Sequence, residues 1–406
     1  MSLQIGSLTL ASPFVLAPMA GVTNAAFRSL CRGYGPGLFV TEMVTARALQ
    51  EGNVKTLRMI APAAGEWPRS LQLYGTDPAT LAWAVNWLCE RELADHIDLN
   101  FGCPAPKVTR RGGGAALPWK TELFKQIVAQ TVAAAGRYNV PLTVKMRLGI
   151  DSEHLTYMQC GLIAQAEGVA AITLHARTAA QMYSGQADWQ TISKLKQLVS
   201  HVPIIGNGDV FTAQDAEKMI TTTGCDGVAV GRGVLGRPWL FAELARLLPN
   251  LMSATSSTTP LPETTDLTLG QVVAVIERHA ELLVEHYRQS DQWAQKMARR
   301  PSVTGFAAEH QAIIEMRGQV AYYLRGFPVG GAVRHKLGLV NSLIDLHVLL
   351  TQLPDQALPV AQATARRGRA GQPAKVALPA NWLASQQLTE QQTGLLHEPE
   401  ISAAGG

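Results

Sequence analysis

The sequence predicts an α/β chain: a (β/α)8 barrel of the TIM type followed by a smaller all-helical domain. From Pro13 to about Leu248, short apolar, β-branched runs alternate with longer amphipathic stretches, which is typical of βα units and a parallel sheet. Eight such units fit into this stretch. The chain has 406 residues, more than the roughly 250 of one barrel, so a second domain is expected. A doubly wound open sheet is the alternative, because counting strands does not exclude it.

The elements follow one another in a regular order. Leu3–Leu10 reads as a short hairpin around Gly6 and Ser7, which we expect to close the bottom of the barrel. The eight strands are expected at Phe14–Ala17, Leu38–Thr41, Ser70–Leu73, His96–Leu99, Leu142–Lys145, Ala171–Leu174, Pro203–Gly206 and Gly227–Val230. The clearest helices between them are Thr80–Glu90, Leu123–Ala135 and Ala213–Thr221.

The composition changes after the predicted barrel, which occupies residues 1–252. Residues 253–268 are rich in Ser, Thr and Pro and poor in bulky apolar residues, which indicates a linker. Residues 269–355 are expected to form a helical domain with helices at Leu269–Arg288, Ala307–Leu324 and Leu337–Leu353. Residues 356–406 are predicted to be a largely disordered tail, with Trp382 docking locally.

Bulk properties narrow the function classes. With 47% hydrophobic and 16% charged residues, the composition is that of an ordinary globular protein, and a net charge of +4 is compatible with a polyanionic partner without identifying one. The five cysteines form no CxxC pair and no metal-ligand spacing. We therefore expect a reduced cytoplasmic protein without a metal site, an iron–sulfur cluster or a membrane span. The oligomeric state stays open, a monomer included.

Polar or glycine-rich residues stand at the ends of the predicted strands. In strand order they are Pro18, Met19 and Ala20, then Glu42, Gln72, Asn100, Lys145 and Arg147, His175 and Arg177, Asn207, Gly208 and Asp209, and Gly231 and Arg232. In a parallel barrel these ends converge on one face, where such enzymes place their chemistry. Packing does not explain this pattern, so the sequence predicts an active-site rim.

The last two strand ends resemble phosphate sites. Glycines in Asn207-Gly-Asp209 and Gly231-Arg-Gly233 let backbone N–H groups approach an anion, a helix start follows each loop, and Arg232 adds a full charge. Barrels often bind phosphate after strands seven and eight. The alternative is that these glycines only make tight turns. Two such loops in this order favour a phosphate-bearing cofactor or a phosphorylated substrate.

Three further residues favour a flavin as that cofactor. A lysine such as Lys145, at the end of a central strand, can stabilise negative charge at the N1–O2 edge of a reduced flavin ring, and Gln72 can pair with the amide edge. His175 can contact either the phosphate or the ring. The alternatives are a solvated strand terminus for Lys145 and a hydrogen-bonded structural residue for His175.

Cys103 differs from the other four cysteines, which sit in contexts that core packing explains. It follows the fourth strand in a Gly-Cys-Pro turn, at the start of a basic loop that holds Lys107, Arg110 and Arg111 and runs into Gly112–Gly114. A thiol in such a place acts either as a nucleophile or as a proton donor to a developing carbanion. The composition of the loop does not choose between the two roles.

The motifs taken together resemble those of the tRNA-dihydrouridine synthases, most closely the bacterial B-type branch. The segments that carry the resemblance are Ala17-Pro-Met-Ala-Gly-Val-Thr23, Asp98-Leu-Asn-Phe-Gly-Cys-Pro104, Val144-Lys-Met-Arg147, Leu174-His-Ala-Arg-Thr178, Gly206-Asn-Gly-Asp209 and Gly231-Arg-Gly233. Each motif is modest evidence alone, whereas the ordered set is specific. The resemblance covers the barrel and continues to about Leu353.

The resemblance implies FMN as the bound cofactor and NADPH as the electron donor. The implied cofactor-binding residues are Pro18, Met19, Ala20, Gln72, Asn100, Lys145, His175, Asn207, Gly208, Asp209, Gly231 and Arg232. In the family, flavin N5 passes a hydride to C6 of uracil, and the thiol that matches Cys103 protonates C5. Cys103 is therefore implied to be a general acid.

The resemblance also implies tRNA as the partner, with a uridine swung out of its stack. The expected substrate-binding residues are Lys107, Arg147, Arg177, Arg317 and Arg325. Glu315–Phe327 aligns with a family motif of the form Arg-Lys-His…Trp-Tyr-Leu, in which Arg317 is retained but Gly318 and Gln319 replace the lysine and the histidine. Loss of that lysine removes one expected contact to the RNA backbone.

Two other functions remain open at this point. One is an FMN barrel oxidoreductase that acts on a free pyrimidine or a small enone, against which the added helical domain argues. The other is a non-catalytic RNA-binding protein on the same scaffold, against which Cys103, Lys145 and the two phosphate loops argue.

Overall fold

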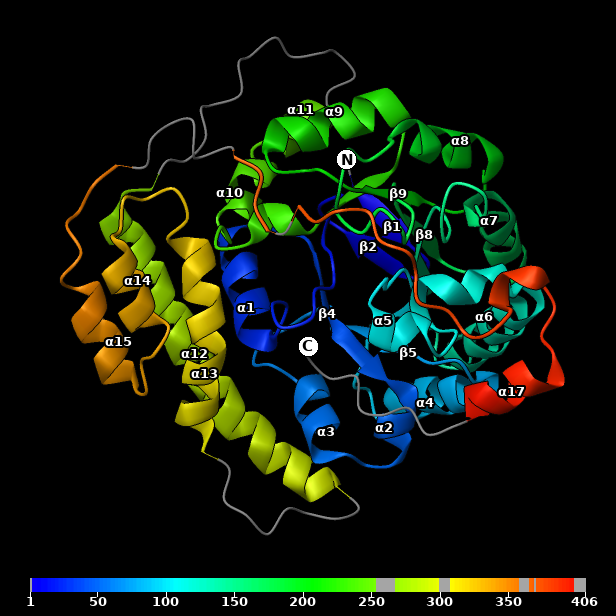
Figure 1. Cartoon of the computed structure of the whole chain (residues 1–406), viewed down its shortest axis with the longest axis horizontal. Helices are drawn as coiled ribbons and strands as arrows, with labels where there is room; N and C mark the ends of the chain where they lie inside the picture. Colours follow the sequence, from blue (N-terminus) through cyan, green and yellow to red (C-terminus); the bar gives the residue numbers. More distant parts are fainter. Residues whose placement is uncertain (1, 253–266, 299–306, 358–364, 369, 398–406) are drawn as a thin grey trace.

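The computed structural model describes residues 2–252, 267–298, 307–357, 365–368 and 370–397, and its centre is a closed barrel of eight parallel strands (Figure 1). Neighbouring strands follow the chain order, and β10 pairs back onto β3. The strands are β3 Phe14–Leu16, β4 Leu38–Thr45, β5 Ser70–Tyr74, β6 His96–Phe101, β7 Leu142–Arg147, β8 Ala171–His175, β9 Ile204–Asn207 and β10 Gly227–Val230. The predicted barrel is therefore confirmed, and the open-sheet alternative is wrong.

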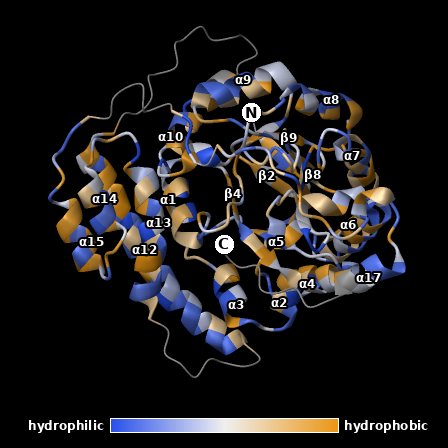
Figure 2. Cartoon of the chain, in the orientation of Figure 1, coloured by the Kyte–Doolittle hydropathy of each residue, from blue (hydrophilic) through white to orange (hydrophobic). Residues whose placement is uncertain are grey.

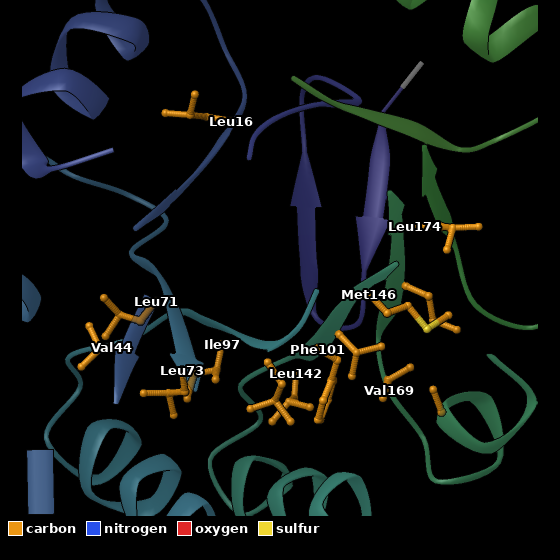
Figure 3. Packing of buried hydrophobic residues seen from close by; sticks show 14 of the residues in the cluster. Leu16, Val44, Leu71, Leu73, Ile97, Phe101, Leu142, Met146, Val169 and Leu174 are labelled. Atoms are coloured by element: carbon orange, nitrogen blue, oxygen red, sulfur yellow. The ribbon is translucent and has the colours of Figure 1, made fainter. Parts of the chain in front are cut away.

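Strand alternation sorts the side chains of the barrel between its inside and its outside. On β6, Ile97, Leu99 and Phe101 are buried among the outer helices, and Figure 3 shows Ile97 and Phe101 in this packing. The ring of Phe101 lies 4.7 Å from that of Phe124 on α6. The intervening residues, such as Asp98 and Asn100, face the barrel interior. Apolar residues on the outer face thus build the core, and polar ones are left for the interior and its rim.

Helices surround the barrel and carry apolar and polar residues side by side (Figure 2). They are α1 Ala25–Tyr34, α2 Ala46–Gln50, α3 Val54–Ile60, α4 Pro78–Glu90, α5 Pro106–Thr109, α6 Thr121–Gly136, α7 Tyr157–Ala166, α8 Gln190–Leu198, α9 Ala213–Thr223, α10 Leu240–Ala245 and α11 Leu248–Met252, with short 3-10 turns η1 Gly114–Trp119 and η2 Arg232–Val234. Local chemistry sets their ends. For example, a capping box of Thr212 and Asp215 begins α9, and Gly224 at φ 71° ends it.

The N-terminal hairpin lies where the sequence predicts it. Strands β1 Leu3–Ile5 and β2 Leu8–Leu10 pair around Gly6, whose φ of 55° suits the turn. Leu3, Ile5 and Leu10 form a buried cluster with residues of several barrel strands, such as Val15 and Ile205. The hairpin therefore closes the bottom of the barrel, opposite the rim.

The second domain packs at the side of the barrel and consists of α12 Leu269–Met297, α13 Ala308–Tyr323, α14 Gly331–Leu337 and α15 Leu343–Leu350 (Figure 1). Helix α12 runs past the predicted end at Arg288, because its last turns continue against α3, where Arg58 and Asp291 lie 3.5 Å apart. The predicted linker lies outside the described residues except for Leu267 and Thr268.

The predicted third helix at Leu337–Leu353 is wrong, because two helices occupy this part of the chain. Helix α14 ends at Leu337, followed by Gly338, and α15 begins only at Leu343, where the Ser342 side chain accepts a hydrogen bond from the N–H of Asp345. The serine cap stops helix propagation through this stretch, although the apolar periodicity continues across it.

Residues 365–368 and 370–397 of the predicted tail follow a defined path, and Trp382 docks locally as the sequence indicates. This segment, orange to red in Figure 1, crosses the barrel and ends in η3 Trp382–Ala384 and α17 Glu390–His397. Arg367, Trp382 and Leu396 are buried in it. Within the described ranges, no helix has the length and apolar character to cross a membrane, and no group of three or more His, Cys, Asp or Glu residues is placed to hold a metal ion.

Candidate active site

A cavity of about 600 Å³ opens at the carboxyl ends of the barrel strands. Its walls include fifteen of the eighteen predicted site residues, namely Pro18, Met19, Ala20, Gln72, Asn100, Cys103, Lys107, Lys145, Arg147, His175, Asn207, Gly208, Asp209, Gly231 and Arg232. The volume lies in the range of small-molecule and cofactor sites. Convergence of strand ends, predicted from the order of the motifs, thus brings these residues together.

A chain of hydrogen bonds fixes the polar groups on the floor of the cavity. Asn100 Nδ2 donates to Gln72 Oε1 at 2.8 Å, and Gln72 Nε2 donates to Asp98 Oδ2 at 2.7 Å. The other carboxylate oxygen, Asp98 Oδ1, accepts from Thr143 Oγ1 at 2.6 Å. Because the oxygen and the nitrogen of each amide have assigned partners, both amide groups have a defined orientation.

Two ionisable groups lie at this floor, the buried Asp98 and the partly buried Lys145. Burial raises the pKa of Asp98 to about 6, although its bonds to Thr143 and Gln72 and the charge of Lys145 lower it. Burial, with Arg147 nearby, lowers the pKa of Lys145 to about 8, while Asp98 raises it. Lys145 Nζ donates to Asn207 Oδ1 at 3.2 Å. At neutral pH the ammonium is therefore still mostly charged, and it lies in a place where water screens it little.

Cys103 lies in a turn that the same network holds. Asn100 Oδ1 accepts from the N–H of Gly102 at 3.1 Å and from that of Cys103 at 2.9 Å, and Arg147 Nε donates to Gly102 O at 2.9 Å. Burial raises the pKa of the thiol, against the lowering influence of the Ala105 backbone and of nearby cations. The thiol is therefore protonated at neutral pH, which favours the proton-donor role over the nucleophile role.

The two glycine loops form one end of the cavity. Gly208 has a φ of 123°, and a Cβ there would lie 2.7 Å from Ala187 Cβ, so the loop requires glycine. At Gly231 a Cβ would meet nothing closer than 3.8 Å, because this backbone faces open space. Asp209 accepts from Arg177 at 2.6 Å and from Arg232 at 2.9 Å. Backbone turns and a guanidinium thus meet at this end, as an anion site requires.

His175 and Tyr183 also line the cavity near its glycine loops. Burial lowers the pKa of His175 well below its usual value, and Arg147, Lys145, Arg177 and Arg232 lower it further. The imidazole is therefore neutral. The ring of Tyr183 has the guanidinium of Arg232 at 4.9 Å and that of Arg147 at 5.6 Å.

Three predicted substrate-binding arginines do not line the cavity. Arg177 is fully buried and donates to Ser184 O, Gly185 O and Asp209. It therefore holds Asp209, which lies at the end of the cavity formed by the two glycine loops. Arg317 donates to Val340 O at 2.8 Å and to Asn341, and Arg325 is exposed on the helical domain. Their roles as substrate ligands remain predictions, although the burial of Arg177 argues against direct contact.

The sequence reading gave no role to several residues that the structure places at the site. Asp98 stands within a quoted motif, and a carboxylate inside an apolar strand could have identified it. Tyr183 carries no such signal, because a loop brings it to the cavity. Glu315 and Gln319 lie in the segment that aligns with the family's RNA-binding motif, and the position of α13 brings them to the cavity as well. Gln319 Nε2 donates to Gly21 O, so α13 contributes a wall.

Comparisons with known proteins agree with this geometry. A family profile described as dihydrouridine synthase matches residues 15–314. A protein from Mycobacterium tuberculosis named probable tRNA-dihydrouridine synthase is 50% identical over 390 residues, which cover 94% of this chain and 92% of that protein. A protein of the same name from Mycobacterium leprae is 48% identical, covering 91% and 95% of the two chains, and tRNA-dihydrouridine synthase B from Pseudomonas aeruginosa is 39% identical, covering 66% and 78%. The chain belongs to the tRNA-dihydrouridine synthase family.

Proposed function

We propose that this member of the family reduces uridines in tRNA to 5,6-dihydrouridine, with FMN as its bound cofactor and NADPH as the source of electrons. One observation carries the proposal: a single cavity is lined by the Cys103 thiol, by the two glycine loops with Arg232, and by the amides of Gln72 and Asn100. Neither a small-molecule barrel enzyme nor a non-catalytic RNA-binding protein accounts for this set together with membership of the family.

The residues of the cavity fit FMN. A phosphate monoester needs backbone N–H donors and a cation, which Gly208, Gly231 and Arg232 offer at one end. The polar edge of the flavin ring needs amide partners, and both Gln72 and Asn100 keep a second N–H beyond the bonds already described. Lys145 supplies positive charge there.

The chemistry of the chain's own residues centres on Cys103. Its thiol delivers a proton to C5 of uracil: the S–H bond breaks, a C5–H bond forms, and the thiolate later regains a proton from water. Arg147, Lys107 and Lys145 are the cations that stabilise the thiolate. When bound, FMN would supply the hydride for C6, and NADPH, oxidised to NADP⁺, would restore its two electrons.

The helical domain is the proposed tRNA-binding part. The exposed Arg325 on this domain and the exposed Lys107 on α5 of the barrel offer cations to phosphates. Gly318 and Gln319 line the cavity where the family motif has lysine and histidine, so this contact differs from the usual one. A cytoplasmic location accords with tRNA and NADPH as reactants.

The test compares the wild type with Cys103→Ala on unmodified tRNA plus NADPH, with dihydrouridine measured by mass spectrometry of the digested nucleosides. We expect the wild type to add two hydrogens to specific uridines. Cys103→Ala is expected to keep its flavin absorbance and to lose about 10³-fold in rate, because it lacks the acid. Cys89→Ala, a buried cysteine on α4, is the matched control. A yellow wild type that oxidises NADPH but leaves tRNA unchanged would overturn the proposal.

A further inference from the structure

The C-terminal segment, residues 365–368 and 370–397, reaches the loop that carries the catalytic thiol. Arg367 fixes its beginning, because its Nη1 donates to Leu235 O in the barrel and to Tyr322 O at the end of α13. Further along, the N–H of Ala374 donates to Ala180 O at 2.9 Å. The segment therefore follows the rim of the barrel before it reaches the Cys103 loop.

Trp382 is buried against the loop that follows Cys103. Its side chain is 1% exposed, and its indole Nε1 donates to Ala116 O at 3.0 Å. The Lys120 ammonium lies 4.8 Å from the ring centroid and also donates to Ser385 O and Gln387 O, at 2.7 and 2.9 Å. A buried lysine thus links the loop to the backbone on the far side of the tryptophan.

Gly112 is shaped to receive the indole ring. Its φ is 74°, and a Cβ built there would lie 2.4 Å from Trp382 Cη2. No side chain fits between this backbone and the ring. The run of three glycines at 112–114 therefore includes one whose missing side chain makes room for a residue 270 positions away.

The two contacts of Trp382 flank the residues that touch Cys103. Between Gly112 and Ala116, the N–H of Ala115 donates to Cys103 O at 3.0 Å. Gly114 packs so closely that a Cβ there would lie 2.5 Å from the same oxygen. The backbone that supports Cys103 is thus held on both sides by one side chain from the C-terminal segment.

We propose that Trp382 is a positioning residue for the reaction: it holds residues 112–116 so that the Cys103 thiol faces the cavity in one place. This inference rests on the proposed function, in which that thiol protonates uracil. A misplacement of about 1 Å in a catalytic group can cost roughly 100-fold in rate. Loss of Trp382 should therefore lower the turnover of tRNA more than its binding.

The test measures Cys103 directly and also measures turnover. In the full-length protein, iodoacetamide alkylation of the peptide containing Cys103 is followed by mass spectrometry, and the other four cysteines are buried. We expect Trp382→Ala to accelerate alkylation at least about tenfold, because the loop opens more often. We expect kcat on tRNA to fall about 100-fold with little change in KM, and NADPH oxidation without tRNA to stay unchanged.

The milder Trp382→Phe keeps a ring against Gly112 and loses the bond to Ala116. Its expected effect is about a fivefold rise in alkylation and a similar fall in kcat, as for one hydrogen bond. Trp293→Ala and Trp293→Phe are the matched controls, because Trp293 lies on α12 and packs against the barrel away from this loop.

The outcomes separate the two proposals. If Trp382→Ala does not fold, Trp382→Phe decides. Alkylation and kcat that match those of the Trp293 variants overturn the positioning role, as does faster alkylation with unchanged kcat. If the wild type makes no dihydrouridine, the proposed function fails, and the alkylation rates alone decide whether Trp382 holds the thiol.

Discussion

The rim of the barrel and the C-terminal segment form neighbouring parts of the same molecule, yet the sequence predicts them very differently. On the rim, Gln72, Asn100 and Lys145 come together because parallel strands end on one face. The C-terminal segment has a composition typical of disorder, yet it buries Arg367 and Trp382. The rim is predictable because the repeating βα pattern fixes where strands end. The docked segment is not, because its place depends on a single partner far away in the sequence, Gly112 for Trp382.

The largest effect is expected from a substitution on the rim, Lys145→Met. Lys145→Met keeps the length of the side chain and removes a charge that lies beside Asn207, in a place where burial makes electrostatic interactions strong. We expect dihydrouridine formation to fall about 10²- to 10³-fold, as for loss of a preorganised group that stabilises developing charge. Steady-state rates on tRNA check this.

The control for Lys145 is another paired lysine. Lys196→Met removes a partner of Asp226 on the outer side of the barrel, where Lys196 is 29% exposed. It should leave turnover almost unchanged. A comparable loss of turnover in both variants would contradict the prediction, because it would mean that Lys145 acts on folding rather than on the chemistry.

Particular residues show how far the sequence reaches. The sequence predicts the eight barrel strands and the two glycine loops in their observed places, because βα periodicity and glycine turn chemistry are local. The end of β4 differs most, since the strand continues to Thr45 rather than ending at Thr41. The break at Gly338–Ser342 was missed because the apolar periodicity runs across it, and only the Ser342 cap marks it. The sequence indicates that Trp382 docks, but not where, because its place depends on the missing Cβ of Gly112.

Arg177 illustrates a different limit. Its position at a strand end placed it on the rim correctly, but its side chain turns inward to Asp209 and to the backbone at Ser184 and Gly185. Period and spacing do not report which way a long side chain turns. The sequence therefore predicts membership of the rim better than it predicts contact with a ligand.

A smaller effect is expected from Lys120→Met, which tests how firmly the C-terminal segment is held. Lys120→Met removes the ammonium that donates to Ser385 O and Gln387 O. Because two carbonyl oxygens lose a charged donor, we expect a loss of about 2 kcal/mol in the free energy of docking. Limited proteolysis should then cut the segment faster while the barrel stays intact.

Lys125→Met is the matched control for this prediction. Lys125 is 52% exposed on α6 and lies 3.9 Å from Glu167. An exposed pair of this kind contributes little, so cleavage of the segment should match the wild type. Equal protection in Lys120→Met would show that Trp382 and Arg367 hold the segment without the lysine.

The smallest effect is a shift in pH dependence that joins the two regions at Cys103. Burial raises the pKa of this thiol, and Lys107 is one of the cations that lower it. Lys107→Met disfavours the thiolate, so the pKa of Cys103 should rise further, and only slightly because Lys107 is exposed and screened. The midpoint of iodoacetamide alkylation against pH should move upward, as should the alkaline limb of tRNA reduction. Arg110→Met changes an exposed cation of the same loop, and a shift of equal size there would show that the net charge of the loop, rather than the place of Lys107, sets the thiol pKa.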